Sequence, residues 1–171
     1  DSVRLRMRSD VPVGILLSGG LDSSSLLAAA NSVSPASSIR ALSVVSRDPA
    51  ASEEHFIDLM VDHIGCEVIK IQSDDNPLEL WEDLESTVWH FDHPISSFSN
   101  IAHRRAINAS RDIGIKVLLT GQGADEQLGG YNKFLYFYLM DELRKGRIKS
   151  PLSMVAACLQ KGTILGEFRL S

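Results

Sequence analysis

This sequence lacks the features of membrane and secreted proteins. It has no apolar run of the ~20 residues that a membrane-spanning helix needs, and its first residues do not form a secretory signal peptide. It contains only two cysteines, Cys66 and Cys158, which are far apart and have no metal-ligand spacing around them. We therefore expect a protein of the reducing cytoplasm that makes no contact with a membrane.

The chain also lacks an excess of charge of one sign. Lys and Arg total 17 and Asp and Glu total 22, so the formal net charge is −5, and the basic residues form no stripe. This balance predicts no nucleic-acid surface. Repeats and low-complexity tracts are absent as well. The 171 residues are expected to form one domain, long enough to bury a proper core.

Apolar runs alternate with amphipathic stretches along the chain. The apolar runs predict strands at residues 14–17, 39–46, 67–72 and 116–119. The amphipathic stretches predict helices at residues 21–31, 52–64, 78–91, 100–113, 128–147 and 152–170, with Ser52 as one cap and Gly114 as one stop. This order predicts an α/β fold, a parallel sheet with helices on both faces. Ligands of such sheets bind at the carboxyl ends of the strands.

The most informative segment is LLSGGLDSS at residues 16–24, the first motif, which lies between a predicted strand and a predicted helix. Its two glycines allow a tight turn whose N–H groups converge on an anion, and the helix directs its positive end there. The hydroxyls of Ser18, Ser23 and Ser24 add donors, and Asp22 adds an oxygen ligand suited to magnesium. These groups fit a magnesium-bound polyphosphate. In the alternative, Ser18 caps the helix and the glycines only shape the turn.

A second glycine-rich turn, LLTGQGADEQLGGY at residues 118–131, follows the fourth predicted strand and is called the second motif here. Asp125 and Glu126 could cap a helix that begins near Gln127. Their position directly after Gly121-Gln122-Gly123 favours a metal or phosphate role instead.

The first motif resembles the Ser-Gly-Gly-x-Asp-Ser loop of the N-type ATP pyrophosphatases, whose fold is the adenine nucleotide α-hydrolase or PP-loop type. It is not a Walker A loop, because no Gly-Lys-Ser/Thr follows the glycines. The two motifs in this order, together with the approach SDVPVGILL at residues 9–17, resemble the asparagine synthetase family. The resemblance extends from about residue 9 to residue 131.

This resemblance implies an enzyme that uses ATP and Mg²⁺ to adenylate the side-chain carboxylate of aspartate. Pyrophosphate leaves, and ammonia then gives asparagine and AMP. It implies that Asp22 and Asp125 bind the metal ion and that these two residues and Gln122 take part in catalysis. Gln122 stands where several relatives have a glutamate that assists the ammonia step. It also implies that ATP is bound by Leu17, Ser18, Gly19, Gly20, Asp22, Ser23, Ser24, Val44, Thr120 and Gly121. Within this set, the adenine ring would contact backbone groups of Leu17, Val44, Thr120 and Gly121.

Family members also carry a glutaminase domain before this region, which supplies ammonia from glutamine, and a helical part after it. We expect residues 1–171 to be part of the synthetase domain of such a protein, with both further parts outside this chain, and the resemblance is compatible with a homodimer. Two alternatives stay open. One is a related adenylating synthetase that forms a β-lactam or macrolactam, and the other is a non-catalytic ATP-binding module, against which the intact Asp22 and Asp125 argue.

Two further groups of residues receive no chemical role. The histidines show no metal spacing, so none of them is assigned to a site: His55, His63, His90, His93 and His103. The aromatic residues between positions 131 and 138 are interpreted as core or as a packing surface rather than as a ligand platform.

Overall fold

The computed structural model describes residues 1–35, 38–48, 52–73 and 77–161. It divides into two compact units, residues 1–121 and residues 122–171. Among the described residues, all strands belong to the first unit, and the second unit is helical. None of the described helices is long and apolar enough to cross a bilayer.

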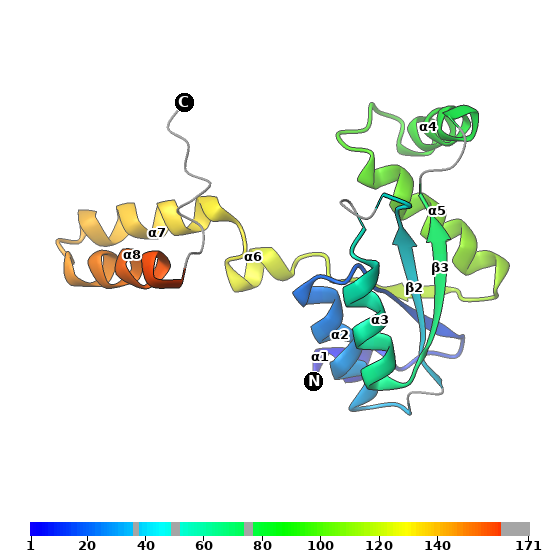
Figure 1. The fold of residues 1–171 in the computed structure, drawn as a ribbon, viewed down its shortest axis with the longest axis horizontal. Helices are drawn as coiled ribbons and strands as arrows, with labels where there is room; N and C mark the ends of the chain where they lie inside the picture. Colours follow the sequence, from blue (N-terminus) through cyan, green and yellow to red (C-terminus); the bar gives the residue numbers. More distant parts are fainter. Residues whose placement is uncertain (36–37, 49–51, 74–76, 162–171) are drawn as a thin grey trace. The chain divides into compact units, whose positions relative to one another are not determined.

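The first unit is built on one parallel sheet (Figure 1). Its elements in chain order are α1 (Ser2–Arg6), β1 (Val13–Leu16), α2 (Leu21–Asn31), β2 (Arg40–Val45), α3 (Glu54–Ile64), β3 (Glu67–Gln72), α4 (Pro77–Phe91), α5 (Ser99–Asp112) and β4 (Val117–Leu119). The strands are ordered β3-β2-β1-β4, and Ile15 in β1 pairs with Ala41 on one side and Leu119 on the other. Each predicted strand end lies within one residue of the observed end.

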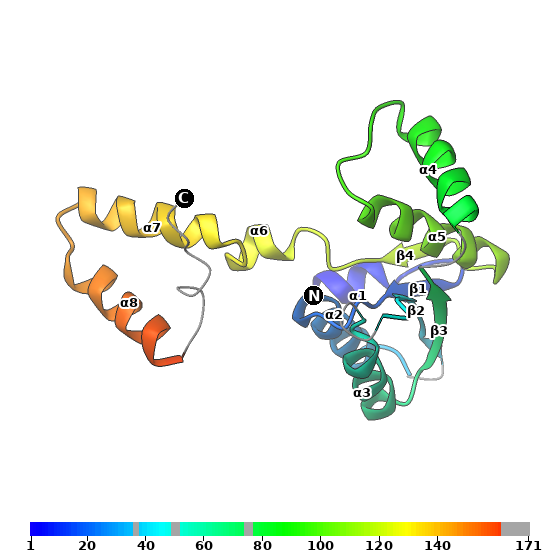
Figure 2. The same cartoon turned by 45° about the horizontal axis from the view of Figure 1, so that its top comes forward.

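Helices cover both faces of this sheet, which confirms the predicted α/β fold. Helices α2 and α3 lie on one face, with α1 against α2, and α5 lies on the other face with α4 packed on it (Figures 1 and 2). The main core forms under α2 and α3, where Ile15, Leu27, Ile57 and Val45 are almost fully buried. Each such side chain contributes about 1.5–3 kcal/mol by leaving water. Cys66 lies in the same core, where burial raises the pKa of its thiol.

The order of the strands fixes where a ligand can bind. The chain moves outward from β1 to β2 and β3, and then returns through α4 and α5 to place β4 beside β1. The direction of winding therefore reverses between β1 and β4. In open parallel sheets the crevice at such a reversal, at the carboxyl ends of the strands, is the usual ligand site. The two sequence motifs directly follow these two strands.

The second unit contains α6 (Ala124–Leu128), α7 (Asn132–Arg144) and α8 (Lys149–Lys161), and α7 and α8 lie side by side (Figure 2). The prediction of one helix over residues 128–147 is wrong. Helix α6 ends at Leu128, and Gly129 follows in the left-handed conformation with φ +73°. Because Gly129 and Gly130 have little helix propensity, the chain breaks there before α7 begins.

Two predicted helix starts also need correction. The helix predicted from residue 152 begins at Lys149, because Pro151 falls within the first turn, where its missing N–H breaks no helical hydrogen bond. Residues 162–170 of that prediction lie outside the described residues. Helix α3 has Glu53 as its N-cap rather than Ser52, although the N–H of Glu54 still donates to Ser52 Oγ at 3.2 Å. The predicted stop at Gly114 fits, since this residue has φ +77° just beyond α5.

Candidate functional site

The first motif forms a tight turn between β1 and α2. Gly19 adopts φ +86°, and a Cβ there would lie 3.1 Å from the carbonyl oxygen of Glu53, so both conformation and space require glycine. Gly20 is the N-cap of α2, and no side chain caps this helix. The alternative in which Ser18 caps α2 is therefore wrong.

Hydroxyl groups hold this turn in shape. The side chain of Ser23 is buried. Its Oγ donates a hydrogen bond to the carbonyl oxygen of Gly20 at 3.1 Å and accepts one from the N–H of Ser18 at 3.1 Å. The Oγ atoms of Ser18 and Ser23 are 3.0 Å apart, and the N–H of Gly20 donates to Ser18 Oγ at 3.3 Å. Because the Ser23 proton is given to Gly20, this serine shapes the turn. The donors that remain for an anion are the N–H groups at the start of α2, which have no acceptor within the helix.

The second motif meets the first at Gly121. A Cβ at position 121 would lie 3.1 Å from the backbone nitrogen of Ser23 and 3.2 Å from Cβ of Asp22, so a larger residue would force these atoms to move apart. The preceding Thr120 is half-buried directly after β4. Two segments that are separated by about a hundred residues in the sequence therefore lie against each other at the strand ends.

The remaining residues of the second motif belong to the second unit. Asp125 lies in the first turn of α6, and Gly130 stands so close to it that a Cβ there would overlap the carboxylate. Tyr131 donates to Glu126 Oε1 at 3.0 Å, and this carboxylate raises the pKa of the tyrosine, so its hydroxyl stays protonated. Gln122 is exposed. Since Asp22 belongs to the first unit, a joint metal site of Asp22 and Asp125 stays a prediction.

The carboxylates suit magnesium only together with a substrate. Within the part of the chain that the structure describes, no group of three or more His, Cys, Asp or Glu is arranged to hold a metal ion. Magnesium is commonly bound by one or two carboxylates and by the phosphates of its substrate. Asp22, half-buried in the first turn of α2 beside the N–H groups that face an anion, fits such a mixed ligand set.

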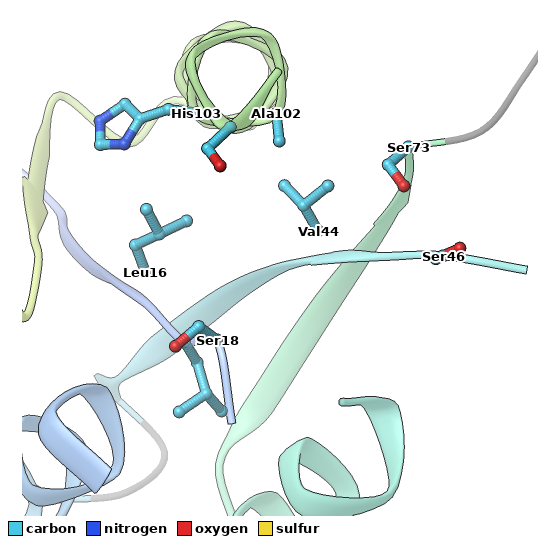
Figure 3. Close-up of a pocket in the computed structure, with 9 residues that line it drawn as sticks. Leu16, Ser18, Val44, Ser46, Ser73, Ala102 and His103 are labelled. Atoms are coloured by element: carbon cyan, nitrogen blue, oxygen red, sulfur yellow. The ribbon is translucent and has the colours of Figure 1, made fainter. Parts of the chain in front are cut away.

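A cavity of about 280 Å³ opens between the strand ends and α5, and it is called the strand-end cavity here (Figure 3). Leu16 and Val44 point into it from the sheet and Ala102 from α5 (Figure 3). The full lining consists of Leu16, Leu17, Ser18, Val44, Ser46, Ser73, Ser99, Ala102 and His103. Its walls are mainly apolar, and hydroxyl groups lie around them, a combination that suits a flat heterocycle with polar edges.

The structure brings some of the predicted adenine groups together and not others. Leu17 and Val44 line the strand-end cavity, and Ser18 belongs both to this cavity and to the turn of the first motif. The N–H of Leu17 donates to the carbonyl of Leu42 at 2.8 Å, so its own carbonyl is the group left for a ligand. Thr120 and Gly121 are not among the lining residues.

Several residues of the cavity were missed by the sequence reasoning. Ser46 and Ser73 directly follow β2 and β3, so the rule that ligands bind at strand ends could have found them. Ala102 and His103 come from α5, and no sequence signal marks them. His103, to which no role was assigned, is therefore part of the wall of a candidate site.

Comparisons with known proteins point to one family. The family model described as asparagine synthase matches residues 1–169. Asparagine synthetase (glutamine-hydrolyzing) 1 of Bacillus subtilis is 36% identical over 166 residues, which cover 95% of this chain and 25% of that protein. This chain thus spans about a quarter of the length of that relative.

Two solved structures share the fold. Glutamine-dependent NAD⁺ synthetase from Acinetobacter baumannii, in complex with ADP, matches with a TM-score of 0.54 and 20% identity over 76% of this chain and 26% of that chain. NH3-dependent NAD synthetase from Campylobacter jejuni matches with a TM-score of 0.52 and 13% identity over 95% of this chain and 80% of that chain. At these identities the likeness concerns the fold alone.

The contact at Gly121 gives a direct test of how the two motifs meet. Replacement Gly121→Ala should lower the free energy of unfolding by about 1–3 kcal/mol, because the new Cβ must displace the backbone of Ser23 and the side chain of Asp22. Urea denaturation measures the change. The matched control is Gly20→Ser, where the nearest atom, Ser18 Oγ, is 3.4 Å from the added Cβ and serine is a good N-cap. Equal stability of both variants would contradict the contact.

Proposed function

This chain belongs to the asparagine synthase family, and we propose that it forms part of an enzyme that uses ATP to adenylate aspartate. The side-chain carboxylate of aspartate becomes an acyl adenylate, pyrophosphate is released, and ammonia displaces AMP to give asparagine. The observation that carries this proposal is the meeting of the two motifs at Gly121, beside the strand-end cavity.

The cavity and the turn suggest how ATP would lie. Adenine would occupy the strand-end cavity, against the apolar side chains of Leu16, Val44 and Ala102. Ser18 links this cavity to the turn, so the triphosphate would extend from the cavity toward the start of α2. There the N–H groups of the first helical turn and the helix dipole favour a phosphate group.

The chain's own residues would then prepare the α-phosphate for attack. A carboxylate oxygen of aspartate attacks the α-phosphorus, the bond from this phosphorus to the bridging oxygen breaks, and pyrophosphate leaves with the negative charge. N–H groups at the turn of the first motif would stabilise this developing charge. Magnesium, held by Asp22 and, as a further part of the proposal, by Asp125, would supply additional positive charge to the phosphates.

The second step depends on a residue that differs from several relatives. Gln122 has an amide in the place of a carboxylate, so it can position ammonia by hydrogen bonds but cannot take up a proton from it. This observation favours, as the second candidate function, a related synthetase that activates a different carboxylate for attack by an amine.

The source of ammonia is also part of the proposal. The Bacillus subtilis relative is described as glutamine-hydrolysing and is about four times as long as the stretch that matches, since the match covers 25% of it. We propose that a glutaminase domain of the parent protein releases ammonia from glutamine, and that the protein acts in the cytoplasm.

Replacement of Asp22 tests the magnesium role. Asp22→Asn should weaken binding of Mg-ATP by roughly 1–3 kcal/mol, the size of a lost charged contact, because the amide is a poorer ligand for the metal. Isothermal titration calorimetry measures this affinity. With ATP in EDTA the two proteins should bind equally or the variant more tightly, because no metal then bridges the carboxylate and the phosphates. Unchanged affinity for Mg-ATP would exclude the role.

The proposed reaction is tested by exchange of labelled pyrophosphate into ATP, measured on the longest protein that contains this chain. We expect exchange that requires both aspartate and magnesium, because the adenylation step is reversible. Glutamate, one methylene longer, serves as the matched control and should support at least about tenfold less exchange. Clear binding of Mg-ATP without aspartate-dependent exchange would favour the second candidate, and loss of both would contradict the proposed site.

A further inference from the structure

A second cavity, of about 250 Å³, lies between α4 and α5 and is called the α4–α5 cavity here. It shares His103 with the strand-end cavity, and its other lining residues are His90, Phe91, Asn100, Arg104, Ile107 and Asn108. Nothing in the proposed reaction uses this cavity. Its volume is below the usual range of 300–1,000 Å³ for drug-sized ligands, so it suits a small molecule.

Arg104 lines the cavity, and one of its donor nitrogens has no partner among the described residues. Arg104 Nη1 is buried and has no hydrogen-bond partner within the described part of the chain. An arginine side chain stays charged in proteins, and a buried donor without an acceptor costs stability. A ligand that offers an acceptor would remove this cost.

The neighbouring arginine shows the contrast. Arg105 Nε lies 2.5 Å from Asp83 Oδ2, and Arg105 Nη1 donates to the carbonyl of Gln72 at 2.9 Å. The fold thus satisfies Arg105 with groups of its own. Arg104, one residue earlier on the same helix, has a donor that the described residues leave unsatisfied.

The other lining groups limit what the ligand can be. None of the described residues that line the cavity carries a carboxylate, so the lining itself offers Arg104 no acidic partner. His90 Nδ1 lies 2.8 Å from the carbonyl oxygen of Ser86, so this ring nitrogen already has a partner on its own helix. Arg104 is the one residue among these lining groups whose side chain always carries a positive charge in proteins. Such a site matches a single negative charge better than a doubly charged phosphate.

The shape of the preferred ligand follows from the apolar part of the lining. Phe91 and Ile107 come from α4 and α5, and much of the cavity wall is apolar. A carboxylate matches the planar fork of a guanidinium with two parallel hydrogen bonds. We propose that the α4–α5 cavity binds a small organic carboxylate, whose charged group pairs with Arg104 and whose apolar body packs against Phe91 and Ile107.

Benzoate is the probe for this proposal, because it combines one carboxylate with a small apolar ring. Saturation-transfer NMR, which observes the ligand, measures its binding to the longest protein that contains this chain. We expect Arg104→Met to weaken benzoate binding by at least about tenfold, as loss of a bidentate charged pair requires. Without benzoate, this variant should melt at the same temperature as the parent protein or higher, because an unsatisfied buried charge has been removed.

Arg105→Gln is the matched control. It should lower the melting temperature, because Asp83 and the carbonyl of Gln72 lose their partner, and leave benzoate affinity unchanged. A second variant, Arg104→Lys, keeps the charge without the fork and should bind benzoate more weakly than the parent protein but more tightly than Arg104→Met.

Three results would overturn the proposal. The first is absence of benzoate binding up to about 20 mM, because a charged pair in an apolar cavity should give a dissociation constant below that concentration. The second is equal affinity of Arg104→Met and the parent protein, and the third is displacement of benzoate by inorganic phosphate at equal concentration. All measurements are made without ATP, so failure here and failure of the proposed adenylation are distinguishable.

Discussion

The close approach of Gly121 to the start of α2 is the constraint on which the candidate site depends. Position 121 has no side chain, so the segment after β4 can lie directly against α2. A Cβ added there would be only 3.1 to 3.3 Å from backbone atoms of Ser23 and Asp22. This contact is possible because β4 is hydrogen-bonded to β1, so that the two strands end at the same edge of the sheet. A helix terminus, the turn of the first motif, Gly121 and an apolar cavity thereby lie at the edge of the sheet where its winding reverses.

The turn of the first motif is organised before any ligand arrives. Ser18 and Ser23 use their hydroxyls on each other and on the backbone of the turn, and Gly19 supplies the left-handed conformation that the turn needs. The N–H groups at the start of α2 are therefore fixed in direction. Fixed donors stabilise a developing charge more effectively than donors that must first reorient, which is the physical basis for placing the leaving pyrophosphate here.

Much of this arrangement could be predicted from the sequence. Alternating apolar and amphipathic stretches gave the strands to within one residue, because buried parallel strands are short apolar runs with clear ends. The break between α6 and α7 was missed. The pattern of apolar residues continues across Gly129 and Gly130, but the backbone leaves the helical conformation at Gly129. The walls that α5 contributes, among them Ala102 and His103, were also missed, because they depend on how that helix packs and no local pattern records it.

A crystal structure of the longest protein that contains this chain, with magnesium and α,β-methylene-ATP bound, is the most direct test of the proposed nucleotide site. We expect the adenine ring in the strand-end cavity against Val44, and the triphosphate at the N–H groups of the first turn of α2 with a magnesium ion at Asp22. A nucleotide bound elsewhere, or one whose phosphates do not touch this turn, would contradict it.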